Sequence, residues 1–164
     1  MIRMAALLLP LCLALAGCDD GPAKPVRTGD PMPPFTATSV DGREFTFPTS
    51  AAGKVLVVRF WASWCAFCRG EMAAIEPVWQ SARDRGLLVV AVNAGQEPDV
   101  VAKFASSLGI TYPVLLDPGS RIARAYGVTG LPTTVFVDRR GMVRGRILGE
   151  TDAATFRRMA EDLL

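Results

Sequence analysis

The stretch RFWASWCAFCRGEM, residues 59–72, decides the fold, because it contains Cys65 and Cys68 with two residues between them. The nearly continuous apolar run KVLVVRFW, residues 54–61, predicts a buried strand, and residues 65–85 have helical character. The cysteine pair therefore falls where a buried strand passes into a helix. Such a pair can be half of a metal site, a haem attachment, a structural bridge, two inert thiols or a redox dithiol.

The ligand inventory argues against the two metal interpretations. A structural zinc site needs four Cys or His ligands, yet the sequence has no histidine, and two of its four cysteines, Cys12 and Cys18, fall in an N-terminal export signal described below, which leaves two for the mature chain. Haem attachment needs a histidine directly after the second cysteine, and Arg69 occupies that position. A bridge between residues so close together closes too small a loop to staple a fold. A redox dithiol remains, with inert buried thiols as the alternative.

The predicted helix assigns different roles to the two cysteines. Cys65 is expected to face the first-turn amide groups, whose partial positive charge favours a thiolate. Cys68 lies three residues on, deeper on nearly the same face. We therefore expect Cys65 to attack a partner disulfide and Cys68 to resolve the mixed disulfide. The intervening Ala66–Phe67 dipeptide is expected to tune the redox potential.

The N-terminus has the character of an export signal. Arg3 precedes an apolar run over residues 4–16, which is shorter than the roughly 20 residues that span a bilayer. Residues 15–18, LAGC, resemble the lipobox of bacterial lipoproteins, in which cleavage leaves the cysteine carrying the lipid. We expect lipidation of Cys18 and loss of Cys12 with the signal, which leaves Cys65 and Cys68 as the free thiols. An ordinary signal peptide and a short uncleaved anchor are the alternatives.

The rest of the chain is expected to form a spacer and one domain. Residues 21–34, GPAKPVRTGDPMPP, contain five prolines and predict an extended spacer. The predicted divisions are a signal peptide at 1–17, lipidated cysteine and spacer at 18–34, and a folded domain at 35–164. The formal charge of +2 is spread along the chain, so no nucleic-acid partner is expected.

Strands and helices alternate along the predicted domain, which indicates an α/β fold with a mixed sheet flanked by helices. The expected strands are two within 35–47 around an Asp41-Gly42 turn, then 54–61, 87–94, 133–138 and 142–149. The expected helices are 65–85, 98–109, 120–127 and 152–164.

Residues 35–164 resemble the thioredoxin superfamily. The similarity rests on WCAFC at 64–68, on GLPTTVFVDRRG at 130–141 with Pro132, and on VAVNAGQEPDVVAKFASSLGITYPVLLD at 90–117. The last segment is similar to the insertion of the extracytoplasmic TlpA/ResA-like branch. The resemblance implies a thioredoxin-like fold with an N-terminal β-hairpin and a thiol-disulfide oxidoreductase, often a reductant in cytochrome c maturation.

The resemblance also implies which residues meet the substrate. Pro132 matches the family's cis-proline, which lets the backbone beside Leu131 pair with a partner strand next to Cys65. Trp64 and the Ala66–Phe67 dipeptide are expected to border the same docking surface.

Two charged residues complete the predicted site. Glu71 matches a glutamate that TlpA/ResA-like members carry three residues after the second cysteine. Arg59 stands where thioredoxin has a buried aspartate, so the usual proton relay is missing. We hypothesise that Arg59 and Glu71 meet beneath Cys68 and that the positive charge favours the thiolate. The alternatives are a solvated Glu71 and an Arg59 that reaches water along the sheet.

The expected cofactor is the redox disulfide alone, since no nicotinamide or flavin motif is present, and no metal is expected. The expected partners are disulfide-containing exported proteins, including apocytochrome c, and a membrane-embedded thiol donor. The protein is expected to be a monomer on the periplasmic side, anchored by the lipid on Cys18. Three rival functions stay open: an oxidant that donates its disulfide, a thiol peroxidase, although WASWC replaces the peroxidase Pro-x-x-x-Thr-x-x-Cys pattern, and a copper-delivery module.

Overall fold

The computed structural model describes residues 24–164. The predicted signal peptide, the loss of Cys12 and the lipid on Cys18 all lie outside the described residues. Within residues 24–164, no helix is both long enough and apolar enough to cross a bilayer.

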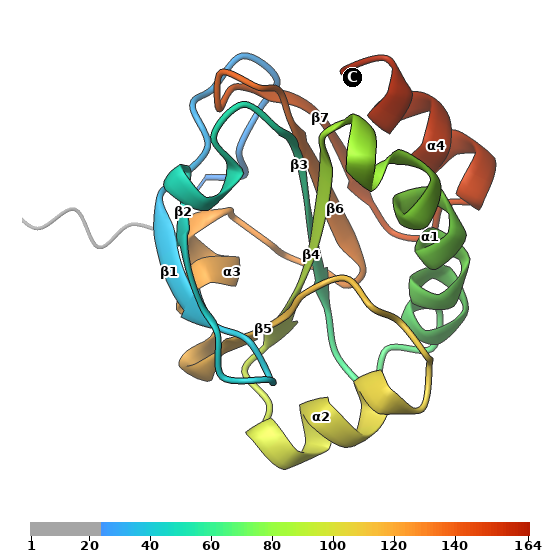
Figure 1. Ribbon diagram of the computed structural model, residues 1–164. Coiled ribbons are helices and arrows are strands. Elements are labelled where there is room, and N and C mark those ends of the chain that lie inside the picture. Colours follow the sequence, from blue (N-terminus) through green and yellow to red (C-terminus); the bar gives the residue numbers. More distant parts are fainter. Residues whose placement is uncertain (1–23) are drawn as a thin grey trace, which may run out of the picture.

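A five-stranded mixed sheet forms the centre of the domain, in the order β5-β4-β3-β6-β7 (Figure 1). Strand β3 pairs in parallel with β4 and antiparallel with β6. Every residue of β3 is buried, which explains its continuous apolar run. The strands are β3 (Val55–Trp61), β4 (Leu87–Ala94), β5 (Val114–Asp117), β6 (Thr133–Val137) and β7 (Val143–Leu148).

Two layers cover the faces of this sheet (Figure 1). Helices α1 (Cys68–Ala82) and α4 (Ala153–Glu161) lie on one face. The opposite face carries the hairpin of β1 (Phe35–Thr38) and β2 (Glu44–Phe47) together with α3 (Arg121–Ala125). Helix α2 (Pro98–Ser106) lies at the end of the molecule where β3 leads into α1. The predicted α/β architecture with an N-terminal hairpin is confirmed. Short 3-10 helices are η1 (Thr49–Ala51), η2 (Arg83–Arg85) and η3 (Pro118–Ser120).

Strand β3 contributes to both cores because its side chains alternate between the faces of the sheet. Val57 and Trp61 belong to the core that includes α1 residues, whereas Val58 and Phe60 belong to the core under the hairpin. Arg59 shares the parity of Val57 and Trp61. The cation of β3 is therefore directed at α1 and is enclosed by the fold.

Two boundaries differ from the sequence-based expectation at α1. The helix begins at Cys68 and not at Cys65, because the Cys68 N–H donates to the Cys65 carbonyl at 3.2 Å and forms a tighter turn than an α-helix has. At its other end, the chain passes into the 3-10 turn η2. Cys65 therefore lies in the turn that precedes the helix.

The expected free spacer is wrong for residues 26–34. Val26 and Met32 are buried in the core under the hairpin. The N–H of Gly29 donates to the Val143 carbonyl at 2.8 Å, and the N–H of Met32 donates to Gly141 at 2.9 Å. Apolar side chains between the prolines give this segment surface to bury, so the folded unit begins before Phe35.

Candidate active site at the start of helix α1

Cys65 and Cys68 form a disulfide, with their Cα atoms 5.4 Å apart. Cys65 retains 7% of its surface exposed, whereas Cys68 has none. A partner sulfur can therefore reach only the first cysteine of the pair. This asymmetry agrees with the roles of attacking and resolving cysteine expected for the two residues.

A polar network that the sequence analysis missed holds the loop before Cys65. Gln96 accepts a hydrogen bond from the Ser63 N–H at 2.6 Å and donates to the Ser63 hydroxyl at 2.7 Å. Asn93, fully buried near the end of β4, donates from its side-chain Nδ2 to Gln96 Oε1 and accepts at Oδ1 from the Gln96 N–H, both at 3.0 Å. The signal in the sequence was an asparagine near the end of the apolar run LLVVAVNA. The network fixes the dithiol loop to the beginning of the insertion that contains α2.

Exposed apolar side chains surround the disulfide. Trp64 is 71% exposed and Phe67 is 55% exposed, and Ala66 is exposed as well. Trp61, in contrast, is fully buried and stacks on Phe104 with ring centroids 4.9 Å apart. Trp64, Ala66 and Phe67, three of the four residues predicted to contact a substrate, are therefore accessible, and their role stays a prediction.

The Leu131-Pro132 peptide bond is cis, and it directly precedes β6. Thr133, the first residue of β6, pairs with Phe60 near the end of β3. The register therefore places the Pro132 loop at the same end of the sheet as the cysteines. Pairing of a substrate strand beside Leu131 stays a prediction.

Arg59 and Glu71 form a buried ion pair between β3 and α1. Arg59 is fully buried and Glu71 is 7% exposed. The second Arg59 terminal nitrogen donates to the Thr134 hydroxyl at 2.9 Å, and the second Glu71 oxygen accepts from the Thr151 N–H. The hypothesised pair is confirmed, and the solvent-exposed alternatives for both residues are wrong. Both oxygens of Glu71 are occupied by donors.

Tyr112 is a buried titratable residue close to the Arg59–Glu71 pair. Its hydroxyl donates to the Met72 carbonyl at 2.8 Å, and the side chain is buried. Burial raises the pKa of Tyr112 well above its usual range, and the nearby charge of Arg59 opposes that rise. Tyr112 therefore stays protonated and adds no charge beside the ion pair.

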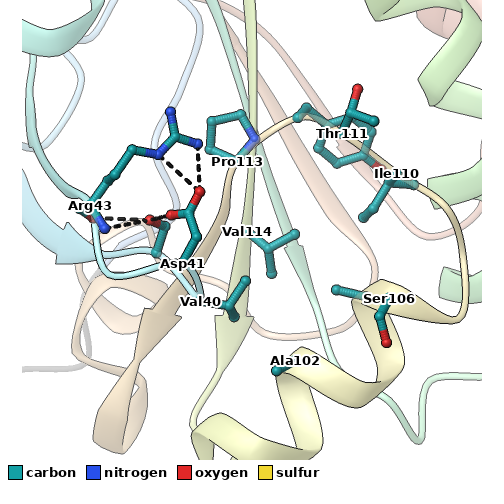
Figure 2. Close-up of a pocket in the computed structure, with 12 residues that line it drawn as sticks. Val40, Asp41, Arg43, Ala102, Ser106, Ile110, Thr111, Pro113 and Val114 are labelled. Atoms are coloured by element: carbon teal, nitrogen blue, oxygen red, sulfur yellow. Dashed lines mark hydrogen bonds and ion pairs between the residues drawn. The ribbon is translucent and has the colours of Figure 1, made fainter.

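A separate pocket of about 240 Å³ lies between the β1–β2 hairpin, α2 and the segment before β5 (Figure 2). Its charged residues, Asp41 and Arg43, are paired with each other at 2.8 Å. The hydrogen bond from Arg43 lowers the pKa of Asp41 to about 2. Since the two charges satisfy each other and no cysteine lines the pocket, it is not part of the redox site.

The arrangement supports two-electron exchange between a dithiol and a disulfide. Within residues 24–164, no three His, Cys, Asp or Glu side chains are grouped so that they could hold a metal ion. A reachable cysteine, a buried partner three residues later and a cis-proline loop at the same sheet edge define the class of thiol-disulfide oxidoreductases.

Comparisons with known proteins agree with this class. Thiol-disulfide oxidoreductase ResA of Geobacillus thermodenitrificans is 35% identical over 124 residues, which cover 76% of this chain and 71% of the relative. ResA of Geobacillus kaustophilus is 31% identical over 138 residues, which cover 84% and 79%. A thiol:disulfide interchange protein of the thioredoxin family from Chlorobium tepidum superposes with a TM-score of 0.74 at 31% identity, covering 85% of this chain and 99% of that one.

Residues 28–146 match the AhpC/TSA family, and the chain belongs to that family. The curated relatives named above make it a thiol-disulfide oxidoreductase of the ResA type. The match begins at residue 28, within the segment that the structure shows packed on the domain.

Proposed function

We propose that the chain is a membrane-tethered, extracytoplasmic reductase of disulfides in exported proteins, with apocytochrome c among its clients. The unequal burial of the two cysteines carries the proposal, because it lets a client sulfur meet Cys65 and keeps Cys68 for the second step. The ResA relatives support the reaction class. The predicted signal and lipobox support the location, and the resemblance to the TlpA/ResA-like branch supports the direction and the client.

The reaction consists of two exchanges that balance in atoms and electrons. The Cys65 thiolate attacks one sulfur of the client disulfide, that S–S bond breaks, and the released client thiolate takes a proton from water. Cys68 then loses its proton and attacks Cys65. The mixed disulfide breaks, the second client thiol leaves, and the Cys65–Cys68 disulfide forms. The client gains two electrons and the chain loses two.

The ion pair engages the carboxylate that follows Cys68 on α1. Glu71 lies one turn after Cys68 on α1, the position from which a carboxylate could accept that proton. Its two oxygens already accept from Arg59 and from the Thr151 N–H. We assign the Cys68 proton to water or to the departing client thiolate.

Renewal of the dithiol needs a thiol donor on the same side of the membrane. A membrane-embedded donor thiol would attack the Cys65–Cys68 disulfide at Cys65, the reachable sulfur, and reverse the two exchanges. The two donor thiols are thereby oxidised to a disulfide, and their two electrons reduce the Cys65–Cys68 disulfide. No further cofactor is required for this cycle.

The test uses the full chain in detergent, reduced and freed of excess thiol. We expect it to reduce a synthetic peptide with a C-x-x-C-H disulfide and to lose this activity in Cys65→Ser. Equal rates on that peptide and on one of scrambled sequence would contradict the cytochrome c client and leave the reductase intact. Faster oxidation by hydrogen peroxide than by either peptide would favour the peroxidase, and tight Cu(I) binding with no peptide reduction would favour the copper module.

A further inference from the structure

A groove beside the active site is lined by residues of α1, α2 and the dithiol loop. We call it the α2 groove, and its cavity volume is about 310 Å³. Its lining residues are Ser63, Arg69, Val100, Lys103, Phe104 and Ser107. Three of them, Val100, Lys103 and Phe104, come from one face of α2, and Ser107 directly follows the helix, so α2 presents a continuous surface to the groove. Figure 1 shows α2 at the end of the molecule where β3 leads into α1.

The groove has an apolar interior with fixed walls. Phe104 is 9% exposed and stacks on the buried Trp61. Val100 leaves 44% of its surface exposed although it is apolar. On the opposite wall, the Arg69 guanidinium lies 4.6 Å above the Phe104 ring and donates to the Ser107 hydroxyl at 3.2 Å. The groove is therefore shaped before any partner arrives.

Both charged residues that line the groove are cations. Neither Arg69 nor Lys103 forms an ion pair with any residue of the described part of the chain. Glu97 and Asp99 lie at the beginning of α2 and do not line the groove. The exposed apolar side chain of Val100, close to two cations without a carboxylate partner, is complementary to an apolar side chain next to a carboxylate.

The groove continues the surface on which sulfur exchange takes place. Ser63 lines it and stands two residues before Cys65, and Arg69 directly follows Cys68. The exposed Trp64 and Phe67 lie in the same loop. A client chain whose cysteine meets Cys65 has its neighbouring residues within reach of the groove, because successive residues of an extended chain are only about 3.3 Å apart.

We propose that the α2 groove docks the client segment that flanks the disulfide, and that it selects segments with an apolar residue next to an acidic one. This inference rests on the proposed function, since the groove acts by holding a disulfide at Cys65. Arg69 and Lys103 bind the carboxylate, and Val100, the exposed apolar residue of the groove, contacts the apolar side chain. The groove thereby makes the rate of disulfide exchange depend on the client residues that flank the disulfide.

The experiment measures second-order rate constants for reduction of two synthetic disulfide peptides by the reduced full chain in detergent. The peptides differ only in a Leu-Glu or a Leu-Lys pair beside the disulfide. We expect the wild-type chain to favour the Leu-Glu peptide at low ionic strength and to lose the preference in high salt. Lys103→Glu should slow the Leu-Glu peptide roughly fivefold and reverse the preference, and Val100→Asp should slow both peptides.

Two controls separate docking from chemistry. Lys54→Glu makes the same change of charge at an exposed residue before β3, at the opposite end of the sheet from Cys65, and should leave the preference intact. Hydroxyethyl disulfide, a small neutral substrate, should react equally fast with every variant.

Each remaining outcome overturns a defined part of the account. Equal effects of Lys103→Glu and Lys54→Glu, or an equal loss on hydroxyethyl disulfide, would overturn the docking role and leave the reductase standing. Failure of the wild-type chain to reduce any of the three disulfides would overturn the proposed function together with the groove's role. A dimer of the wild-type chain that Val100→Asp dissociates would assign the groove to self-association.

Discussion

Arg59 in the middle of β3 and Glu71 on the first turn of α1 form a buried ion pair on the same side of the sheet as the redox cysteines. The pair joins the central strand to the helix that carries Cys68. Thr134 of β6 and the Thr151 N–H add one hydrogen bond to each charge, so four segments of the chain meet at the pair, while the Arg59 Nε stays without a hydrogen-bond partner. Such a pair is specified by the whole fold, and each charge depends on the other for its burial.

Removal of one partner should therefore be costly. Arg59→Leu leaves the Glu71 carboxylate buried without its counter-ion, and we expect it to lower the free energy of unfolding by about 3–5 kcal/mol. The double variant Arg59→Leu/Glu71→Gln carries no buried charge and should recover most of that loss. Urea unfolding of the oxidised protein measures all three forms. A double variant as unstable as Arg59→Leu would show that the pairing of charges is not the cause.

The two members of the pair should shift the dithiol in opposite directions. Arg59→Leu leaves a negative charge near the cysteines and should raise the pKa of Cys65 in the reduced protein, whereas Glu71→Gln leaves a positive charge and should lower it. Thiolate absorbance followed against pH measures both. Shifts of the same sign in the two variants would indicate a general loosening of the fold, and no shift in either would end the electrostatic role of the pair.

The unequal exposure of the cysteines predicts which variant captures a client. Cys68→Ser keeps the reachable Cys65 and lacks the resolving thiol, so it should accumulate a mixed disulfide with a disulfide peptide. Cys65→Ser keeps only the fully buried thiol and should accumulate none. Intact mass measured under non-reducing conditions distinguishes the two. Equal trapping by both variants would contradict the assigned order of attack.

The carboxylate of Glu76 should make stability depend on acid pH. Burial raises its pKa, but three donors to the carboxylate outweigh burial and hold the pKa below the ordinary 4.5. These donors are the Thr111 hydroxyl, the Thr111 N–H at 2.8 Å and the Gln80 side-chain amide at 2.7 Å. The folded pKa is thus the lower one, so this stabilisation is complete above about pH 4.5 and is lost as the pH falls through the folded value.

The comparison with Glu76→Gln isolates that contribution, because the other carboxyl groups are the same in both proteins. The wild type should be the more stable protein at neutral pH, and its advantage should shrink below pH 4.5. Urea unfolding across this range measures it. An advantage that does not change with pH would show that the hydrogen bonds do not favour the ionised form.

Residues 59–72 could be predicted well from the sequence, and the N-terminal segment could not. The apolar run of β3 and the spacing of the cysteines are local properties of the sequence. The junction between strand and helix can therefore be predicted from a few neighbouring residues. The Arg59–Glu71 pair could be hypothesised because a cation in a buried strand needs a carboxylate. The packing of residues 26–34 depends on surfaces of β7 and α3 far along the chain, and the prolines concealed it. The bonds of Gln96 to Ser63 are likewise visible only in three dimensions.

The packed N-terminal segment can be tested at Gly127, which has a φ of +60° and would place an added Cβ against the Pro25 backbone. Gly127→Ala should lift this segment and expose the bond after Arg27 to trypsin. Gly119→Ala is the matched control, because Gly119 has a φ of +69° but open space where its Cβ would lie. Equal cleavage of the two variants would show that backbone strain alone is responsible and that the segment is not displaced.

The equilibrium reduction potential of the Cys65–Cys68 disulfide tests the proposed direction of electron flow most directly. The full chain in detergent is titrated against a thiol-disulfide buffer and followed by the fluorescence of Trp61 and Trp64. A reductant kept charged by a membrane donor predicts a potential near the roughly −270 mV of thioredoxin. A value near about −120 mV, that of a strong oxidant, would contradict the account and make the chain a disulfide donor.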